Sequence, residues 1–384
     1  MTLEERWSHD LAELRAQGRY RSLSAPFGID LSSNDYLGYG SEYPCPPTSI
    51  PRSPERNGAL SRSGLASRLL RGQHPIWDEV EATLAGWHGA EAALVMTSGY
   101  VANEGLLSTV IEADDWVASD ALNHASLIDG ARLSRAERFI YRHQDLDHLE
   151  SGLHAAAARR RNVRQQFFIV TESLFGMDGD QTTLTSIIGI AERHGAHVIV
   201  DEAHATGCFG PTGSGLVDAA GLRSRVLATV HTGGKALGVP GAYICGSQVL
   251  RELLINRCRH LIFTTALPPA VGEWWLETIT RVRADHTSRA RLHEAAAVFR
   301  SALAQQGIKA LGDDYIVPIV FGSDAVAVHA AERLQSLGYD IRAIRPPSVP
   351  PGTARLRIAV HADHDPAILK AVALELAQVC GNQV

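Results

Sequence analysis

The chain has 384 residues, enough for two or three domains or for one large domain with an appendage. Its 45% hydrophobic and 20% charged residues are typical of a globular protein. The net charge of −6 argues against a nucleic-acid-binding protein, and no apolar run is long enough to span a membrane. The five cysteines form no C-x-x-C pair, which argues against a metal cluster or a disulfide framework and predicts a cytoplasmic protein without a metal site.

The predicted elements begin with a helix, because Leu3, Trp7, Leu11 and Leu14 recur every three or four residues. This helix belongs to an N-terminal arm over residues 1–44. The Pro-, Ser- and Arg-rich stretch from Tyr43 to Arg56 is predicted to be a linker.

Short apolar runs then alternate with helical stretches between residues 91 and 247. The strand candidates are AALVM, WVAS, RFIY, QFFIV, HVIVD, LATV and AYICG. This alternation predicts an α/β domain with a mostly parallel central sheet flanked by helices, over residues 45–280. A long helical stretch follows, and a new strand–helix pattern from about Tyr315 predicts a small C-terminal α+β domain over residues 281–384.

One lysine, Lys235, lies in the glycine-rich stretch VHTGGKALGVPGAY after a predicted strand. Such a lysine is a point charge for a phosphate, an amine that forms a covalent bond, or a surface residue in a turn. A P-loop is excluded, because Ala236 follows the lysine and Thr229 stands where the first glycine belongs.

Other polar residues follow the ends of other predicted strands. Asp201 and His204 lie in VIVDEAHATG, Gly99 lies in VMTSGYVANEG where a strand runs into a helix, and His124 lies in SDALNHASL. Each alone is explained by a cap or a turn, but ligands bind at the carboxyl ends of parallel strands. Together with Lys235 they suit pyridoxal phosphate. A lysine holds this cofactor covalently, an aspartate pairs with its pyridine nitrogen, and a helix N-terminus binds its phosphate.

Ordered motifs along nearly the whole chain resemble the α-oxoamine synthases. They are SSNDYLG, SGYVAN, NHASL, TESLFGMDGD, DEAHATG, TGGKALG, RHLIFTTALPP and IRAIRPPSVPPGTARLRIAV. The resemblance implies a type I (aspartate-aminotransferase-like) fold and the cofactor pyridoxal 5'-phosphate. The last motif is most similar to the biotin-pathway branch, whose members join L-alanine to a pimeloyl thioester.

The resemblance assigns a role to each matching position. Lys235 would hold the cofactor, Asp201 would pair with the pyridine nitrogen, and His204 would bond the phenolate oxygen. His124 would stack on the ring and contact the substrate. The phosphate would be bound by Gly99, Tyr100 and Thr232, joined by Thr264 and Thr265 of a second subunit in a homodimer whose active site lies at the interface.

Substrate contacts follow from the same matches. Asn34 and Arg357 would bind the amino acid's carboxylate, with Arg355 as the other candidate. A guanidinium group binds a carboxylate through two parallel bonds. Arg21 and Ser348 would contact the substrate.

Four positions depart from the family pattern. Gly176, predicted at the cofactor, stands where a serine is frequent. Gly233 replaces an aromatic residue before the lysine, and Leu70 and Arg71 replace a small or polar pair.

The expected activity is therefore a decarboxylative condensation of L-alanine with a pimeloyl thioester, carried by coenzyme A or an acyl carrier protein. The alternatives are a relative that uses glycine or another acyl thioester, and a non-catalytic binding protein of the same fold.

Overall fold

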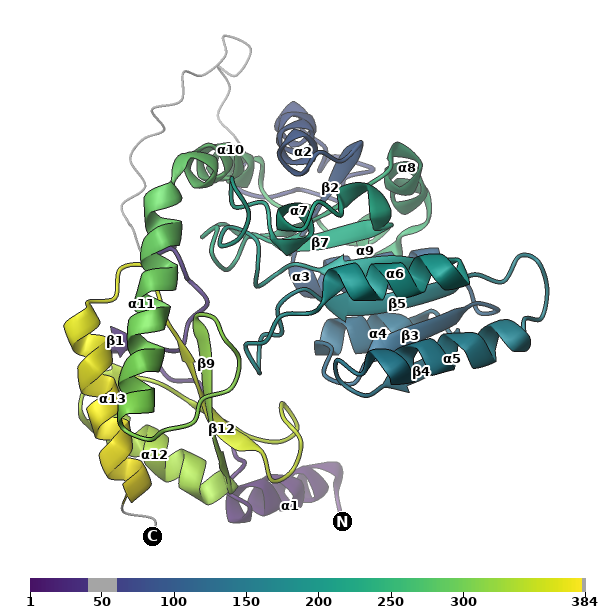
Figure 1. Cartoon of the computed structure of the whole chain (residues 1–384). Helices are drawn as coiled ribbons and strands as arrows, with labels where there is room; N and C mark the ends of the chain where they lie inside the picture. Colours follow the sequence, from purple (N-terminus) through teal and green to yellow (C-terminus); the bar gives the residue numbers. More distant parts are fainter. Residues whose placement is uncertain (41–60, 382–384) are drawn as a thin grey trace. The chain divides into compact units, whose positions relative to one another are not determined.

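The computed structural model describes residues 1–40 and 61–381, so the predicted linker from Tyr43 to Arg56 lies outside the described residues (Figure 1). The chain divides into two compact units. The larger unit comprises Leu37–Phe175 and Gln181–Arg289, and the smaller comprises Met1–Tyr36, Gly176–Asp180 and Ala290–Val384.

A seven-stranded sheet with the strand order β2-β8-β7-β6-β5-β3-β4 forms the centre of the larger unit (Figure 1). Only β8 runs antiparallel to its neighbours, which confirms the predicted mostly parallel sheet. All seven strand candidates are confirmed. The strands are β2 (Ala92–Met96), β3 (Trp116–Asp120), β4 (Glu137–Tyr141), β5 (Phe167–Glu172), β6 (Ala196–Asp201), β7 (Ala228–Thr232) and β8 (Ala242–Gly246).

Helices cover both faces of this sheet, as expected for parallel strands joined by helical crossovers. Short α7 and the 3₁₀ turn η2 lie between β6 and β7 in the sequence. The helices of the larger unit are α2 (Pro75–His88), α3 (Gly99–Val110), α4 (Ala125–Leu133), α5 (Leu146–Ala158), α6 (Leu184–His194), α7 (Leu216–Ala219), η2 (Arg223–Arg225), α8 (Gln248–Arg257), α9 (Arg259–Ile262) and α10 (Pro269–Ala284).

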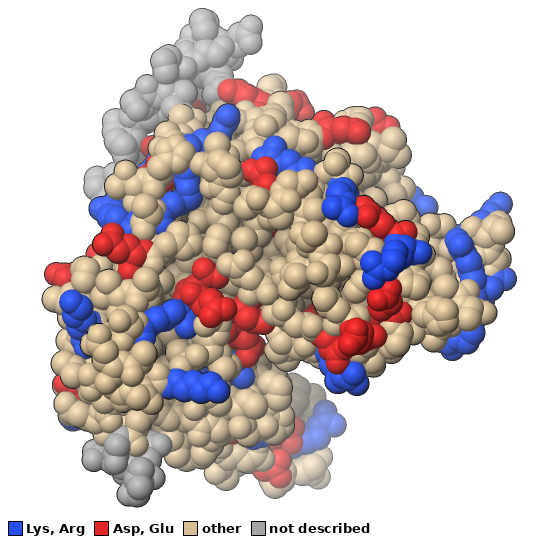
Figure 2. Space-filling model, viewed as in Figure 1, with Lys and Arg blue, Asp and Glu red and all other residues tan. Residues whose placement is uncertain are grey.

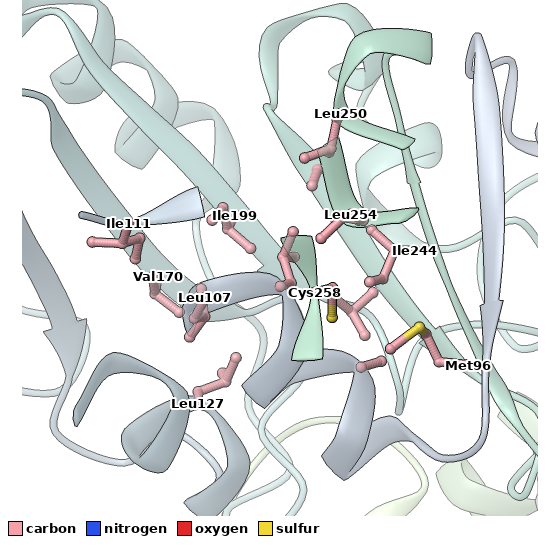
Figure 3. Close-up of a cluster of buried hydrophobic side chains, with 14 of the residues drawn as sticks. Met96, Leu107, Ile111, Leu127, Val170, Ile199, Ile244, Leu250, Leu254 and Cys258 are labelled. Atoms are coloured by element: carbon pink, nitrogen blue, oxygen red, sulfur yellow. The ribbon is translucent and has the colours of Figure 1, made fainter. Parts of the chain in front are cut away.

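Successive side chains of each strand point to opposite faces of the sheet, and each face packs against a different set of helices. Ile199 packs on the face covered by α3, α4, α8 and α9, where it joins Leu107, Leu127 and Leu254 (Figure 3). The alternate residues of β6, such as Val198, pack against α5 and α6 on the other face. Because side chains alternate along a strand, Asp201 shares the face of Ile199 and is directed toward α3 and α4.

The predicted long helical stretch is two helices, α10 and α11 (His286–Gln305), which are separated at Asp285. The Asp285 carboxylate accepts hydrogen bonds from the Tyr39 hydroxyl and from the Ser288 amide, at 2.8 Å each. An aspartate that accepts a backbone N–H in this way favours a helix start, which accounts for the break.

The smaller unit contains a three-stranded antiparallel sheet with the order β11-β12-β9. A separate parallel pair joins β1 to β10. The predicted α+β pattern is confirmed, although β11 is only two residues long. The remaining elements are α1 (Leu3–Ala16), β1 (Ile29–Asp30), β9 (Ile316–Gly322), α12 (Asp324–Ser336), β10 (Tyr339–Asp340), β11 (Ala343–Ile344), β12 (Ala354–Ala359) and α13 (Pro366–Gly381).

Helix α1 confirms the predicted N-terminal helix, and its start is stabilised by a capping box between Thr2 and Glu5. Its apolar stripe nevertheless stays exposed, since Trp7 keeps 51% and Leu11 42% of its accessible surface.

The visible surface carries acidic and basic residues that are interspersed (Figure 2). Within the described part of the chain, every helix is too short or too polar to cross a bilayer.

Candidate active site

Lys235 lies in the loop that follows β7, in the larger unit. Its Nζ is 2.7 Å from His204 Nε2, which lies in the turn after β6. Since β6 and β7 are adjacent and parallel, their carboxyl ends bring the two residues together. The structure therefore places Lys235 beside the DEAHATG motif, while the cofactor roles of both residues stay predictions.

Gly233 is explained by the packing of this loop. A side chain on residue 233 would meet the ring of Trp275 at 2.6 Å and the carbonyl of Val239 at 2.3 Å. Trp275 on α10 is fully buried and donates from its indole nitrogen to the Pro240 carbonyl at 3.0 Å. The Val239 carbonyl and the tryptophan therefore leave no room for a side chain at residue 233.

Asp201 ends β6 and is buried, with 5% of its surface exposed. Its Oδ2 accepts a hydrogen bond from Asn103 Nδ2 at 2.6 Å, and its Oδ1 accepts from the Ala203 amide at 2.7 Å. Both carboxylate oxygens are therefore held by donors, which fixes the orientation of the group that is predicted to pair with a ring nitrogen.

His124 caps the N-terminus of α4. Its Nδ1 accepts from the Ser126 amide and lies 2.7 Å from the Ser126 hydroxyl, which itself accepts from Asn103 Nδ2 at 3.0 Å. Although His124 is exposed, desolvation by the surrounding protein lowers its pKa; Asp201 opposes this effect and Lys235 reinforces it. A neutral, accessible imidazole suits stacking on a flat ring.

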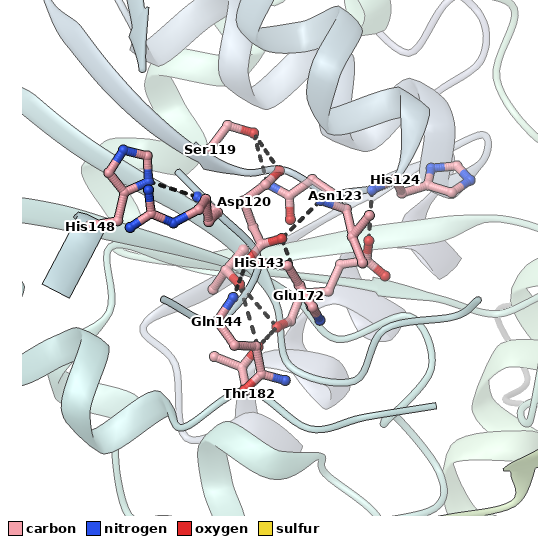
Figure 4. A network of polar contacts seen from close by, with 12 residues as sticks. Ser119, Asp120, Asn123, His124, His143, Gln144, His148, Glu172 and Thr182 are labelled. Atoms are coloured by element: carbon pink, nitrogen blue, oxygen red, sulfur yellow. Dashed lines mark hydrogen bonds and ion pairs between the residues drawn. The ribbon is translucent and has the colours of Figure 1, made fainter. Parts of the chain in front are cut away.

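Further polar contacts hold the His124 segment in place (Figure 4). The Glu172 carboxylate at the end of β5 accepts from the His124 amide at 2.6 Å. Asn123 Nδ2 donates to the Ser119 hydroxyl at 2.9 Å and to the Val170 carbonyl at 2.8 Å. The start of α4 is therefore anchored to β3 and β5, the two strands beside it.

The predicted anion site lies at the N-terminus of α3. Ser98 caps this helix by accepting from the Val101 amide at 3.3 Å, and the amides of Gly99 and Tyr100 precede the first intrahelical hydrogen bonds. A Cβ on Gly99 would lie 3.6 Å from Thr232 Oγ1, so the Thr232 hydroxyl adjoins this helix end. Amides at a helix N-terminus beside a hydroxyl suit a phosphate group.

Tyr100 also contacts Asp129 through its hydroxyl, and this hydrogen bond raises the pKa of Tyr100 to about 12. Thr264 and Thr265 lie after α9 in the same unit. A small cavity there is lined by both threonines together with Arg68 and His260. Their predicted role concerns a second subunit and stays a prediction.

The predicted carboxylate-binding residues lie in the smaller unit. Arg357 on β12 is 6% exposed and donates from its Nη2 to Asn34 Oδ1 at 2.9 Å and to the Tyr36 hydroxyl at 3.0 Å. Its Nε donates to the Gly176 carbonyl. Among the described residues, no carboxylate forms an ion pair with Arg357.

Arg355, the other candidate, forms an ion pair with a carboxylate of the protein itself. It pairs with Asp178 at 2.7 Å and donates to the carbonyls of Met177 and Thr353. The geometry therefore favours Arg357 as the residue that binds a substrate carboxylate.

Arg21 and Ser348 are also in contact in the smaller unit. Arg21 Nη2 donates to the Ser348 hydroxyl at 3.1 Å, and Arg21 is exposed. In the larger unit, Leu70 keeps 74% of its surface exposed and Arg71 is exposed as well.

The structure adds supporting residues that the sequence analysis did not assign. Asn103 joins Asp201 to Ser126, and Glu172 binds the His124 amide. Asn103 was detectable in principle, because it lies one helical turn after Gly99 in the SGYVAN motif.

A cavity of about 530 Å³ in the larger unit lies apart from these residues, at the amino end of β7. It is lined by residues that include His88, Glu202, Ala228 and Cys245, and none of the predicted site residues lines it.

Comparison with known proteins agrees with the geometry. Residues 27–376 match the family model for aminotransferases of class I and II. The chain is 43% identical over 379 residues to an 8-amino-7-oxononanoate synthase of Chlorobaculum parvum, covering 94% of this chain and 95% of that protein. It is 41% identical over 385 residues to the protein of the same name from Anaeromyxobacter dehalogenans, covering 96% and 94%.

Solved structures show the same fold. A serine palmitoyltransferase from S. paucimobilis with a bound pyridoxal phosphate–myriocin adduct superimposes with a TM-score of 0.87 at 27% identity, covering 100% of this chain and 99% of that one. An 8-amino-7-oxononanoate synthase from Francisella tularensis has a TM-score of 0.73 at 24% identity, covering 93% and 98%. The chain therefore belongs to the class I and II aminotransferase family and, within it, to the α-oxoamine synthases, acyltransferases that depend on pyridoxal phosphate.

Proposed function

We propose that this enzyme condenses L-alanine with a pimeloyl thioester, with loss of carbon dioxide, to give 8-amino-7-oxononanoate for biotin synthesis. The observation that carries the proposal is the identity of about 40% over nearly the whole chain to proteins of that name. The arrangement of Lys235, His204, Asp201 and His124 supports it, because these residues supply the groups that the chemistry needs.

Bound pyridoxal phosphate supplies an electron-withdrawing ring that stabilises negative charge at the amino-acid Cα. Lys235 would hold the cofactor between turnovers, and its amine, once free of the cofactor, would take the Cα proton at Nζ. His204 lies 2.7 Å from that nitrogen, which supports the proposal that it would bond the phenolate oxygen. Asp201, held by Asn103, would keep a proton on the ring nitrogen.

The phosphate is assigned to the α3 N-terminus, with Gly99, Tyr100 and Thr232. Thr264 and Thr265 are assigned to the phosphate of a second subunit, so we propose a homodimer with an active site at its interface. The cofactor contact of Gly176 stays a prediction; without a side chain it offers only backbone groups.

For the amino acid, Arg357 and Asn34 are proposed to bind the carboxylate, and Arg21 and Ser348 to contact the rest of the substrate. Arg355 is not proposed for this role, because Asp178 already neutralises its charge. A cytoplasmic location stays a prediction from the cysteine pattern.

The test is a competition assay with L-alanine, glycine and L-serine, using pimeloyl-coenzyme A and pimeloyl-acyl carrier protein in parallel. One methyl group in an apolar pocket changes specificity by about 10- to 200-fold, so L-alanine should exceed glycine within that range. A preference for glycine or serine would remove the alanine assignment and leave the wider family activity intact. Comparing the rates with the two carriers shows whether the thioester of coenzyme A or that of the acyl carrier protein is the substrate.

A further inference from the structure

A buried histidine lies on the opposite face of the sheet from Asp201, close to the Lys235 loop. His231 on β7 is fully buried, and Nδ1 and Nε2 lie 2.7 Å from the hydroxyls of Thr206 and Thr229 respectively. The Thr206 hydroxyl donates to the Glu202 carbonyl at 2.8 Å, so it accepts from His231 Nδ1–H. The Thr229 hydroxyl then donates to Nε2, and the imidazole is neutral with both nitrogens satisfied.

His88 and Cys245 lie beside His231. Nitrogen and sulfur atoms of the three residues lie within 4.8 Å of one another, a spacing that also suits metal ligands. His88 Nε2 is 2.8 Å from the Tyr243 hydroxyl, and both nitrogens of His231 are bonded to threonines. The cluster is therefore a hydrogen-bonded network rather than a set of metal ligands.

The two threonines differ in what they connect. Thr229 lies on β7 itself, two residues before His231, so its bond stays within one strand. Thr206 lies in the turn after β6, two residues beyond His204. The bond between Thr206 and His231 therefore joins the segment that carries His204 to the strand that leads into Lys235.

We propose that His231, acting through Thr206, is a positioning residue that fixes the His204 turn relative to Lys235. The inference rests on the proposed function, in which both residues hold the cofactor. A turn that is already ordered loses less conformational freedom when the cofactor binds, so the apoprotein binds it more tightly.

The test measures the Kd of the apoprotein for pyridoxal phosphate, by fluorescence titration, in threonine variants of similar burial. Thr206→Val removes the connection between the segments and should raise the Kd by about 2- to 10-fold, the effect of one hydrogen bond. Thr229→Val is the matched control and should leave the Kd near that of the wild type, whatever its unfolding temperature. Thr206→Ser keeps the hydroxyl and should restore binding.

A second pair of variants tests the same connection by substituting His231. An asparagine amide reaches the position of Nδ1, whereas a glutamine amide reaches that of Nε2. His231→Asn should therefore retain cofactor affinity, and His231→Gln should weaken it as Thr206→Val does. Equal Kd values within each pair would overturn the proposal.

His204→Ala separates this inference from the function on which it rests. If His204→Ala leaves the Kd unchanged, the assignment of His204 to the cofactor is wrong. If it raises the Kd while Thr206→Val does not, only the positioning role fails.

Discussion

Lys235 is one of only three lysines in the chain, and the other two, Lys309 and Lys370, are exposed. Reduction with borohydride should attach the cofactor to the peptide that contains Lys235. Lys235→Ala should lose both this attachment and turnover, because no other amine replaces it. Mass spectrometry of the digested protein measures the label, with Lys309→Ala and Lys370→Ala as controls. Cofactor found on either exposed lysine would contradict the assignment.

Arg357 and Arg355 provide a second comparison between neighbouring residues. Arg357→Ala should raise the KM for L-alanine and for glycine alike by about 10- to 100-fold. In both cases the carboxylate of the substrate loses its charge-assisted hydrogen bond from the guanidinium group.

Arg355→Ala should instead lower stability, by about 2 kcal/mol or more, because Asp178 is left without its partner. Steady-state kinetics and denaturant unfolding of both variants separate the two effects. A larger rise in KM for Arg355→Ala would move the carboxylate site to that residue.

At the level of elements, the turn after β6 is attached to α7 through one carboxyl group. Glu202 Oε1 accepts from the amides of Leu216 and Val217 at 2.8 and 3.1 Å. Burial raises the pKa of Glu202 from 4.5 to about 7, despite these hydrogen bonds. The folded state therefore binds this proton more tightly than the unfolded state does.

The protonated Glu202 carboxyl therefore stabilises the folded state fully below pH 4.5, and this stabilisation is lost as the pH rises to about 7. Over this window the loss amounts to about 3 kcal/mol, at about 1.4 kcal/mol per pKa unit. Glu202→Gln should remove this part of the pH dependence, which urea unfolding between pH 5 and 8 measures. Identical slopes for variant and wild type would show that the carboxyl does not titrate in this range.

Strand ends were the most predictable part of the site. Apolar runs located the strands, and the rule that parallel strands present ligands at their carboxyl ends placed Asp201, His204 and Lys235 together. The supporting contacts were not predictable in this way. Asn103 lies 98 residues before Asp201, and Glu172 lies 48 residues after His124, so their pairing depends on strand order and on the packing of α3 and α4.

Local composition also failed to separate α10 from α11. The stretch is continuously helical in pattern, and the Asp285 cap that breaks it is also held by the Tyr39 hydroxyl, which lies 246 residues earlier. The exposed stripe of α1 is a similar case, because helical spacing predicts an apolar face but not what covers it.

For the whole molecule, the proposed homodimer predicts complementation between inactive variants. Lys235→Ala and a Thr264→Ala/Thr265→Ala double variant should each be inactive or severely impaired. In a symmetric dimer, an equal mixture should regain about a quarter of wild-type activity, because half of the dimers are mixed and each has one intact site. Sedimentation measures assembly in the same samples. A fully active monomer, or a mixture without recovery, would contradict shared sites.

The order in which the chain is synthesised has a consequence for how its two units form. The larger unit is complete once Arg289 has been made, whereas the smaller unit combines Met1–Tyr36 and Gly176–Asp180 with Ala290–Val384. Asn34 meets Arg357 across 323 residues of sequence, and β1 pairs with β10 near the end of the chain. During synthesis, β1 therefore cannot pair until β10 has been made. The proposed amino-acid carboxylate site can therefore form only after Arg357 has been made, when the whole Lys235 loop has already been synthesised.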